Sequence, residues 1–334
     1  MDRLRRALVI GINSYERTSQ LTGCVADAEA MSQVLEAHAD LEPNYECRVL
    51  LDKLEDGRWI TRAALHKACE ELFTDVRDDV LLYFSGHGVL TPLGGYLCAY
   101  DSYRDEWGVS MDVILKMANA SRARDILMIF DCCHAGDFAN PALLPAGNGQ
   151  NPLALLRENM TVIAASLGSQ AALEAGGHGI FTTAVLSALR GGAADIMGWV
   201  TAPAIYSYVE RRFGAFDQRP VYKSYATGIR GVRKCLPLIE RSKLLQLVNL
   251  FIAEDYLYRL DPEYEPEDEH GMVHEPVNHE KVAIAQLFKR FRDAGLLITT
   301  IPGEQLYWTA RLRHTVELTS LGREYWWLVK HKKI

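Results

Sequence analysis

Two polar segments of the sequence carry side chains suited to nucleophilic chemistry. Ser85–Gly88 places His87 between two glycines, and Asp131–Gly136 contains Cys133. A cysteine that attacks a carbonyl carbon needs a base within hydrogen-bond reach and N–H donors for the oxyanion that forms. We therefore predict that Cys133 is a nucleophile and that His87 is its general base.

Each of these segments follows an apolar run that we predict to be a strand. Val80–Ser85 and Ile126–Asp131 are apolar along nearly their whole length, which is typical of strands buried on both faces of a sheet sandwiched between helices. In open α/β sheets, functional sites lie beyond the carboxyl ends of the strands. If the two strands are neighbours, His87 and Cys133 come together at one edge of the sheet.

The rest of the first two-thirds of the chain alternates strand-like and helix-like segments, which predicts an α/β fold with crossover connections. The further predicted strands are Ala7–Ile12, Arg48–Leu51 and Thr161–Ala165. The predicted helices are Asp27–His38, Thr61–Phe73, Ser110–Ala120, Phe181–Arg190 and Ala202–Phe213.

The sequence changes character after about residue 235, so we predict two domains, 1–235 and 236–334. The acidic stretch Asp261–Glu280 looks like an exposed excursion. It precedes a predicted helix over Val282–Ala294, a predicted strand over Tyr307–Leu312 and a closing helix. This order predicts a small α+β domain of the winged-helix type.

Bulk composition excludes some classes of protein. A net charge of -7 and a pI near 5.8 argue against a bulk nucleic-acid binder. No apolar run approaches the ~20 residues of a membrane span. With no export signal and an odd number of cysteines, seven, we expect a cytoplasmic protein with reduced thiols.

Three separated motifs resemble the caspase-like peptidases, above all their metacaspase and bacterial branch. They are GINSY followed by GCVADA, then SGHG, then DCCHAG, with GIFTTAVLSAL and QRPVY farther on. His87 also precedes Cys133 by roughly 50 residues, as in caspases. The resemblance covers residues 5 to 225. It implies a caspase-like sheet between helices and a cysteine endopeptidase with a Cys133–His87 dyad, whose oxyanion hole consists of the Gly88 and Cys133 amides.

The resemblance also implies a specificity. Asp27 and Asp131 match the acidic residues that line the primary pocket in the branch that cuts proteins after Arg or Lys. A carboxylate in that pocket repels an aspartate side chain and pairs with a guanidinium or ammonium group. The sequence departs from the usual pattern at Cys132 and Ala135, where serine is frequent, and neither change should prevent the chemistry.

A zinc site is the main alternative interpretation of the cysteine segment. Its ligands would be His87, Cys132, Cys133 and His134, but successive residues of an extended chain point to opposite sides, and C-x-x-C spacing is absent. A Cys132–Cys133 disulfide would be strained. We predict no metal site and no required cofactor. Calcium stays open because some metacaspases bind it; for Asp101 and Glu174 we favour solvated loop charge.

The long segment Asp137–Asn159, rich in proline, glycine and asparagine, suggests a mode of activation. Caspase-like enzymes are often switched on by cleavage of this linker. Arg157 is the one basic residue between Cys133 and the next predicted strand. It is our candidate processing site, to be cut by the enzyme itself or by an upstream protease.

The C-terminal domain leaves two partner classes open. Residues 236–334 hold 13 Lys and Arg against 15 Asp and Glu, which weakens phosphate binding, although Lys289, Arg290 and Arg292 keep DNA open. We favour a regulatory protein as partner. The alternative function is a non-catalytic caspase-fold scaffold, but the retained cysteine, histidine and pocket acids favour a peptidase. The resemblance suggests a role in bacterial defence or cell death.

Overall fold

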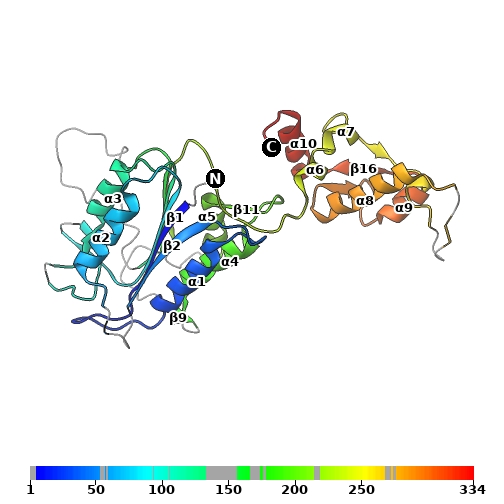
Figure 1. Cartoon of the computed structure of the whole chain (residues 1–334). Coiled ribbons are helices and arrows are strands. Elements are labelled where there is room, and N and C mark those ends of the chain that lie inside the picture. Colours follow the sequence, from blue (N-terminus) through cyan, green and yellow to red (C-terminus); the bar gives the residue numbers. More distant parts are fainter. Residues whose placement is uncertain are drawn as a thin grey trace. The chain divides into compact units, whose positions relative to one another are not determined.

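The chain forms two compact units. The computed structural model describes residues 5–52, 57, 59–92, 94–104, 106–132, 156–165, 174–175, 178–213, 219–267, 272–273 and 276–334, with only the backbone at 174, 175 and 178. The first unit comprises Met1–Ala194 and Trp199–Leu236, and the second comprises Asp195–Gly198 and Pro237–Ile334 (Figure 1). Buried Ile196 joins the second unit, where its carbonyl accepts hydrogen bonds from the amides of Leu238 and Ile239.

A six-stranded sheet in the order β12-β8-β7-β3-β1-β2 organises the first unit. Neighbouring strands are parallel except β12, which runs antiparallel to β8 at the edge. The strands are β1 (Arg5–Gly11), β2 (Tyr45–Leu51), β3 (Val80–Ser85), β7 (Ile126–Asp131), β8 (Met160–Ala164) and β12 (Val221–Tyr225).

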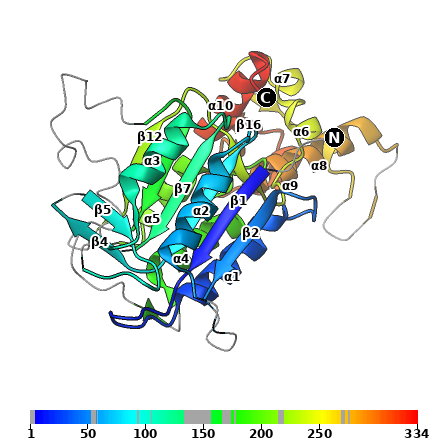
Figure 2. The same ribbon diagram turned by 60° about the vertical axis from the view of Figure 1, so that its left-hand side comes forward.

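Helices cover both faces of this sheet (Figures 1 and 2). Leu82 and Phe84 of β3 pack in one core with α2 and α3, whereas Leu81 and Tyr83 pack in the other core with α1, α4 and α5. Every residue of β3, β7 and β8 is buried. The predicted sandwich is therefore confirmed. The helices are α1 (Cys24–Glu36), α2 (Arg62–Phe73), α3 (Met111–Ala120), α4 (Ile180–Ser187) and α5 (Ala202–Glu210).

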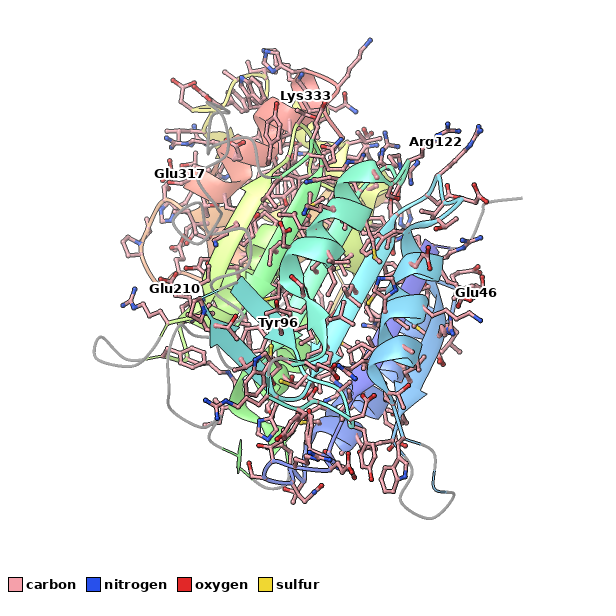
Figure 3. All side chains as sticks on the ribbon, turned by 90° about the vertical axis from the view of Figure 1, so that its left-hand side faces the viewer. Glu46, Tyr96, Arg122, Glu210, Glu317 and Lys333 are labelled. Atoms are coloured by element: carbon pink, nitrogen blue, oxygen red, sulfur yellow. The ribbon has the colours of Figure 1, made fainter. Side chains whose placement is uncertain are left out.

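Two features of the first unit were not predicted from the sequence: a π-helical turn after α4 and a small antiparallel sheet after His87. The predicted helix Phe181–Arg190 ends its α-helical part at Ser187 and continues as a π-helical turn, which contains Gly191 at φ +119°. An antiparallel sheet, β4-β5-β6, follows His87 directly. In Figure 3, the label Tyr96 locates β5 of this sheet, and the label Arg122 locates the segment between α3 and β7. The small strands are β4 (Gly88–Thr91), β5 (Gly94–Leu97), β6 (Val109–Ser110), β9 (Glu174–Ala175), β10 (His178–Gly179), β11 (Trp199–Thr201) and β13 (Gly231–Lys234).

The second unit has its own core and a three-stranded antiparallel sheet, β14-β16-β15. The strand predicted over Tyr307–Leu312 is wrong, because this segment is helix α9. Leu306, Thr309 and Ala310 are buried at helical spacing while Trp308 faces outward, 46% exposed. The winged-helix interpretation stays a prediction. The elements are α6 (Arg241–Leu244), α7 (Leu247–Leu250), β14 (Tyr258–Arg259), a 3-10 turn η6 (Pro262–Tyr264), α8 (His279–Asp293), β15 (Leu297–Thr299), α9 (Leu306–Arg311), β16 (Thr315–Leu318) and α10 (Ser320–Lys330).

Within the described part of the chain, no helix combines the length and the apolar character that crossing a membrane requires.

Close packing at the end of β1 yields a first prediction. A Cβ at Gly11 would collide with the carbonyl oxygen of Cys24, at the start of α1. Gly11→Ala should therefore lower the free energy of unfolding by about 1–3 kcal/mol, as overpacking typically does. Chemical denaturation measures this loss. Gly228→Ala is the control, because nothing lies within 4 Å of a Cβ there; equal stability of the two variants would contradict the prediction.

Candidate active site

The two polar segments leave the same edge of the sheet. β3 and β7 are parallel neighbours, with Ser85 paired to Asp131. The amide of Gly86 extends the pairing by donating to the carbonyl of Asp131 at 3.3 Å. The condition set for bringing the two segments together, that these strands are neighbours, is thus met. His87 and Cys133 each follow two residues after a paired strand end, although Cys133 itself lies outside the described residues.

The imidazole of His87 is oriented by the backbone of the loop after β1. Its Nε2 lies 2.8 Å from the carbonyl oxygen of Ser19 and 3.3 Å from the Ser19 hydroxyl. A carbonyl oxygen only accepts, so Nε2 carries the hydrogen of the neutral ring, and Nδ1 becomes the acceptor. This tautomer is the one in which Nδ1 can take a proton from a neighbouring thiol.

Tyr15 holds the backbone of His87 through a hydrogen bond. Its hydroxyl accepts from the amide of His87 at 2.7 Å and donates to the carbonyl of Ile12 at 3.2 Å. The two ring centroids are 4.6 Å apart. Burial, the main cause, raises the pKa of Tyr15 well above its ordinary value, so the hydroxyl keeps its proton and both hydrogen bonds persist near neutral pH.

The loop that contains Tyr15 and Ser19 is itself held by polar side chains. The buried carboxylate of Asp52 accepts from the amides of Asn13 at 3.1 Å and Ser14 at 2.5 Å. The side-chain oxygen of Asn13 accepts from the amide of Cys24 at 2.9 Å, which satisfies a donor in the first turn of α1. The position of the histidine is therefore tied to the ends of β1 and β2 and to the start of α1.

Asp27 and Asp131 converge on one glycine. The amide of Gly179 donates to Oδ2 of Asp27 at 3.1 Å. A Cβ at Gly179 would lie 2.6 Å from Oδ2 of Asp131 and 3.3 Å from Oδ2 of Asp27. The fold thus brings together two acids that are 104 positions apart, as the numbering in the sequence shows, and only a residue without a side chain fits between them.

Two hydroxyl groups complete the surroundings of Asp131. Thr182 donates to its Oδ2 at 2.6 Å, and the Tyr83 hydroxyl lies 2.6 Å from that of Thr182. The pKa of Asp131 is raised to about 6; burial is the main cause, the Thr182 hydrogen bond acts against it, and the charge of Asp27 adds to it. This carboxyl therefore changes charge close to physiological pH.

Several of these residues escaped the analysis of the sequence. Tyr15 and Thr182 lie in the GINSY and GIFTT motifs, which were noted in the sequence with no role assigned to either residue. Tyr83 looks like any other apolar position of a buried strand. Ser19 contributes mainly its backbone carbonyl, which leaves no trace in residue type.

The remaining residues of the predicted oxyanion hole and zinc alternative are only partly described. Gly88 begins β4 and pairs with Leu97. Cys132 is buried, at 3% exposure. Cys133, His134 and Ala135 lie outside the described residues. The oxyanion hole stays a prediction.

Arg157, the candidate processing site, makes several hydrogen bonds within the first unit. Its guanidinium donates to the carbonyls of Ser121 and Ala123, both at 2.6 Å, and its amide donates to the Asn119 side chain at 3.0 Å. These bonds hold the segment before β8 against the end of α3 and the segment that follows it. Cleavage after Arg157 would first require their release.

Asp101, one of the two acids considered for calcium, is bound to Arg62. Asp101 accepts from the amide of Arg62 at 2.7 Å and pairs with its guanidinium at 3.4 Å. Glu174 lies on β9, and its side chain is not described. Among the side chains that the structure does describe, no three His, Cys, Asp or Glu residues form a group that could hold a metal ion.

The cations of α8, which kept DNA binding open, have acidic neighbours. Lys289 lies 2.6 Å from Glu265, and Arg292 lies 2.9 Å from Asp293. Arg290 is 3.9 Å from Glu240. A phosphate backbone would compete with these carboxylates, which weakens the case for nucleic acid as the partner of this unit.

Comparisons with known proteins agree with the motifs. The family described as "Caspase domain" matches residues 4–229. Metacaspase-1B of Aspergillus fumigatus is 32% identical over 146 residues, which cover 40% of this chain and 35% of that protein. Metacaspase-5 of Trypanosoma brucei brucei is 32% identical over 145 residues, covering 39% and 28%. The match thus spans about a third of the length of these metacaspases. The crystal structure of caspase-1 from Spodoptera frugiperda aligns with a TM-score of 0.49 and 14% identity, over 70% of this chain and 93% of that one.

The contacts of Tyr15 yield a second prediction. Tyr15→Phe removes the acceptor of the His87 amide and should lower the free energy of unfolding by about 1–3 kcal/mol, the cost of leaving such a group without a partner. Thermal denaturation compares it with Tyr225→Phe, at a side chain that is 55% exposed. A Tyr15→Phe protein as stable as wild type would contradict the role assigned to this hydroxyl.

Proposed function

The chain belongs to the caspase-domain family, whose members are cysteine peptidases, and we propose that it is a cysteine endopeptidase that cuts proteins after Arg or Lys. Cys133 is the nucleophile and His87 the general base. Asp27 and Asp131 bind the cationic side chain that precedes the scissile bond.

The reaction uses the tautomer that Ser19 favours. Nδ1 of His87 takes the proton of the Cys133 thiol as the sulfur attacks the scissile carbonyl carbon. The amides of Gly88 and Cys133 donate to the oxyanion. The imidazolium then protonates the leaving amine, and water hydrolyses the thioester, with His87 again as base. Throughout, the Ser19 carbonyl holds the Nε2–H bond and so fixes the orientation of the ring.

The observation that carries the proposed specificity is the convergence of Asp27 and Asp131 on Gly179. Both carboxyls are buried, at 2% and 6% exposure. Two adjacent buried carboxyls ionise reluctantly, which the raised pKa of Asp131 reflects. A guanidinium or ammonium group of a substrate relieves this repulsion and forms charge-assisted hydrogen bonds.

The same arrangement rejects other side chains at that position. An aspartate would add a third negative charge to the site. A neutral side chain would leave the repulsion between the two carboxylates uncompensated. The lack of a side chain at Gly179 lets its backbone approach both carboxylates, which a Cβ there would crowd.

The assignment of the nucleophile yields a third prediction. Cys133→Ala should abolish cleavage of an Arg-containing fluorogenic peptide, and His87→Ala should do nearly the same. Cys132→Ser should retain most of the activity, because the D-x-C-H motif matches the second cysteine. An Arg chloromethyl ketone should alkylate Cys133, as peptide mapping by mass spectrometry can establish.

One control variant and two contradicting outcomes make this experiment decisive. His66→Ala removes an exposed histidine of α2 and should leave turnover unchanged. Alkylation at Cys132, or a Cys133→Ala protein that still cleaves the peptide, would overturn the dyad. Normal turnover in His87→Ala would transfer the role of base to another group.

The pocket yields a fourth prediction. Asp27→Asn and Asp131→Asn should each lower kcat/KM for Arg and Lys substrates by about 30-fold or more, the cost of losing a desolvated charged partner. Activity on cationic substrates requires ionised Asp131, so it should decline as the pH falls below about 6. Asp112→Asn, which alters a surface pair with Lys116, is the control. A peptide library that favours cleavage after Asp would exclude this pocket.

A further inference from the structure

A chain of two hydroxyl groups ends on Asp131. Thr182 Oγ1 donates to Asp131 Oδ2 at 2.6 Å, and the Tyr83 hydroxyl lies 2.6 Å from Thr182 Oγ1. Both Tyr83 and Thr182 are fully buried. The one hydroxyl hydrogen of Thr182 goes to the carboxylate, so Tyr83 must donate to Thr182. Both O–H bonds therefore point toward Asp131.

These two residues reach Asp131 from opposite sides in the sequence. Tyr83 lies on β3, next to β7, and Thr182 lies in the first turn of α4. The alternation along β3 turns Tyr83 toward the face that α1 and α4 cover. Asp131 at the end of β7 turns to the same face, since it meets Thr182 of α4 and the Gly179 segment. The three side chains thus form one line across three elements.

The two hydroxyl groups counteract the effects that raise the pKa of Asp131. Burial is the largest effect on Asp131 and disfavours its charged form, and Asp27 of α1 adds a like charge. The hydroxyl and the backbone of Thr182 both favour the charged form. Burial raises the pKa of Tyr83 well above its ordinary value, so Tyr83 remains a donor throughout the neutral range. Among the described residues, Asp27 and Tyr83 are the titratable groups that face Asp131 here.

The line also fixes which oxygen is available. Thr182 holds Oδ2, the atom that also borders Gly179. A carboxylate held at one oxygen keeps one rotamer, and its second oxygen has a fixed direction. Fixed direction is what a planar guanidinium needs for a paired hydrogen bond.

We propose that Thr182, supported by Tyr83, is a specificity-determining positioning residue that keeps Asp131 charged and aligned for a cationic substrate side chain. This inference rests on the proposed peptidase function. In this proposal, discrimination between charged and neutral substrate side chains depends on the hydroxyl group of Thr182, which does not itself contact the substrate.

The test uses the full-length protein and two peptides that differ at one position. One peptide has Arg before the scissile bond, and the other has citrulline, the neutral isostere of Arg. Thr182→Val removes the hydroxyl at constant shape and keeps the backbone amide. Thr182→Ser restores a hydroxyl and is the matched control, and Tyr83→Phe removes the outer donor alone.

Thr182→Val should lower kcat/KM for the Arg peptide by about 10- to 100-fold, as expected for a hydrogen bond to a charged group, with little change for the citrulline peptide. The acid limb of the Arg profile should move to higher pH, because loss of the donor raises the pKa of Asp131. Thr182→Ser should resemble wild type, and Tyr83→Phe should shift both readouts less, in the same direction. The rate and pH profile of Cys133 alkylation by iodoacetamide, a small neutral reagent, should not change.

The outcomes distinguish a failure of this inference from a failure of the proposed peptidase function. If wild type prefers Arg to citrulline but Thr182→Val keeps the same preference and acid limb, this inference fails and the peptidase proposal stands. If wild type shows no preference, both the proposed specificity and this inference fail. If Thr182→Val does not fold, Tyr83→Phe decides: an unchanged preference and acid limb in that variant overturns the inference.

Discussion

The parallel pairing of β3 with β7 is the constraint on which the rest of the structure depends. Both strands are buried along their whole length, and each contributes side chains to two separate cores. A slip of one residue would move every side chain to the opposite face. The pairing of Ser85 with Asp131 is therefore fixed by the packing of apolar side chains on both faces of the sheet, and not by the polar residues of the site. The departure of both polar segments from one edge follows from that register.

The histidine is supported by one backbone carbonyl and by a network of side chains. The Ser19 carbonyl accepts from its ring, and the Tyr15 hydroxyl accepts from its amide. The side chains of Asp52 and Asn13 hold the start of the loop that contains both residues. These groups have fixed directions once the loop is folded, so the ring is oriented before any substrate arrives, which lowers the entropic cost of reaching the reactive geometry.

The acidic pair is held at a cost in stability. Burial of two carboxyls side by side is unfavourable, and the hydroxyl of Thr182 and the amide of Gly179 offset only part of this cost. A site that stays partly uncompensated in the free protein gains most when a cation enters. A side chain at position 179 would add to this cost, because its Cβ would crowd both carboxylates.

Sequence patterns predicted five of the six strands of the main sheet, the helices that cover it and the candidate Cys–His pair, but they did not predict the edge strand β12. Long apolar runs and helical periodicity are local signals, and polar residues after a buried strand end stand out without tertiary information. The roles of Ser19, Tyr83 and Thr182 became visible only once the elements were placed in three dimensions. A carbonyl has no residue signature, and Tyr83 is indistinguishable from a core residue until its hydroxyl meets α4. The short helix α9 was missed for the same reason, since the packing of Leu306 and Ala310 against the second core, and not the propensity of the segment, selects the helix.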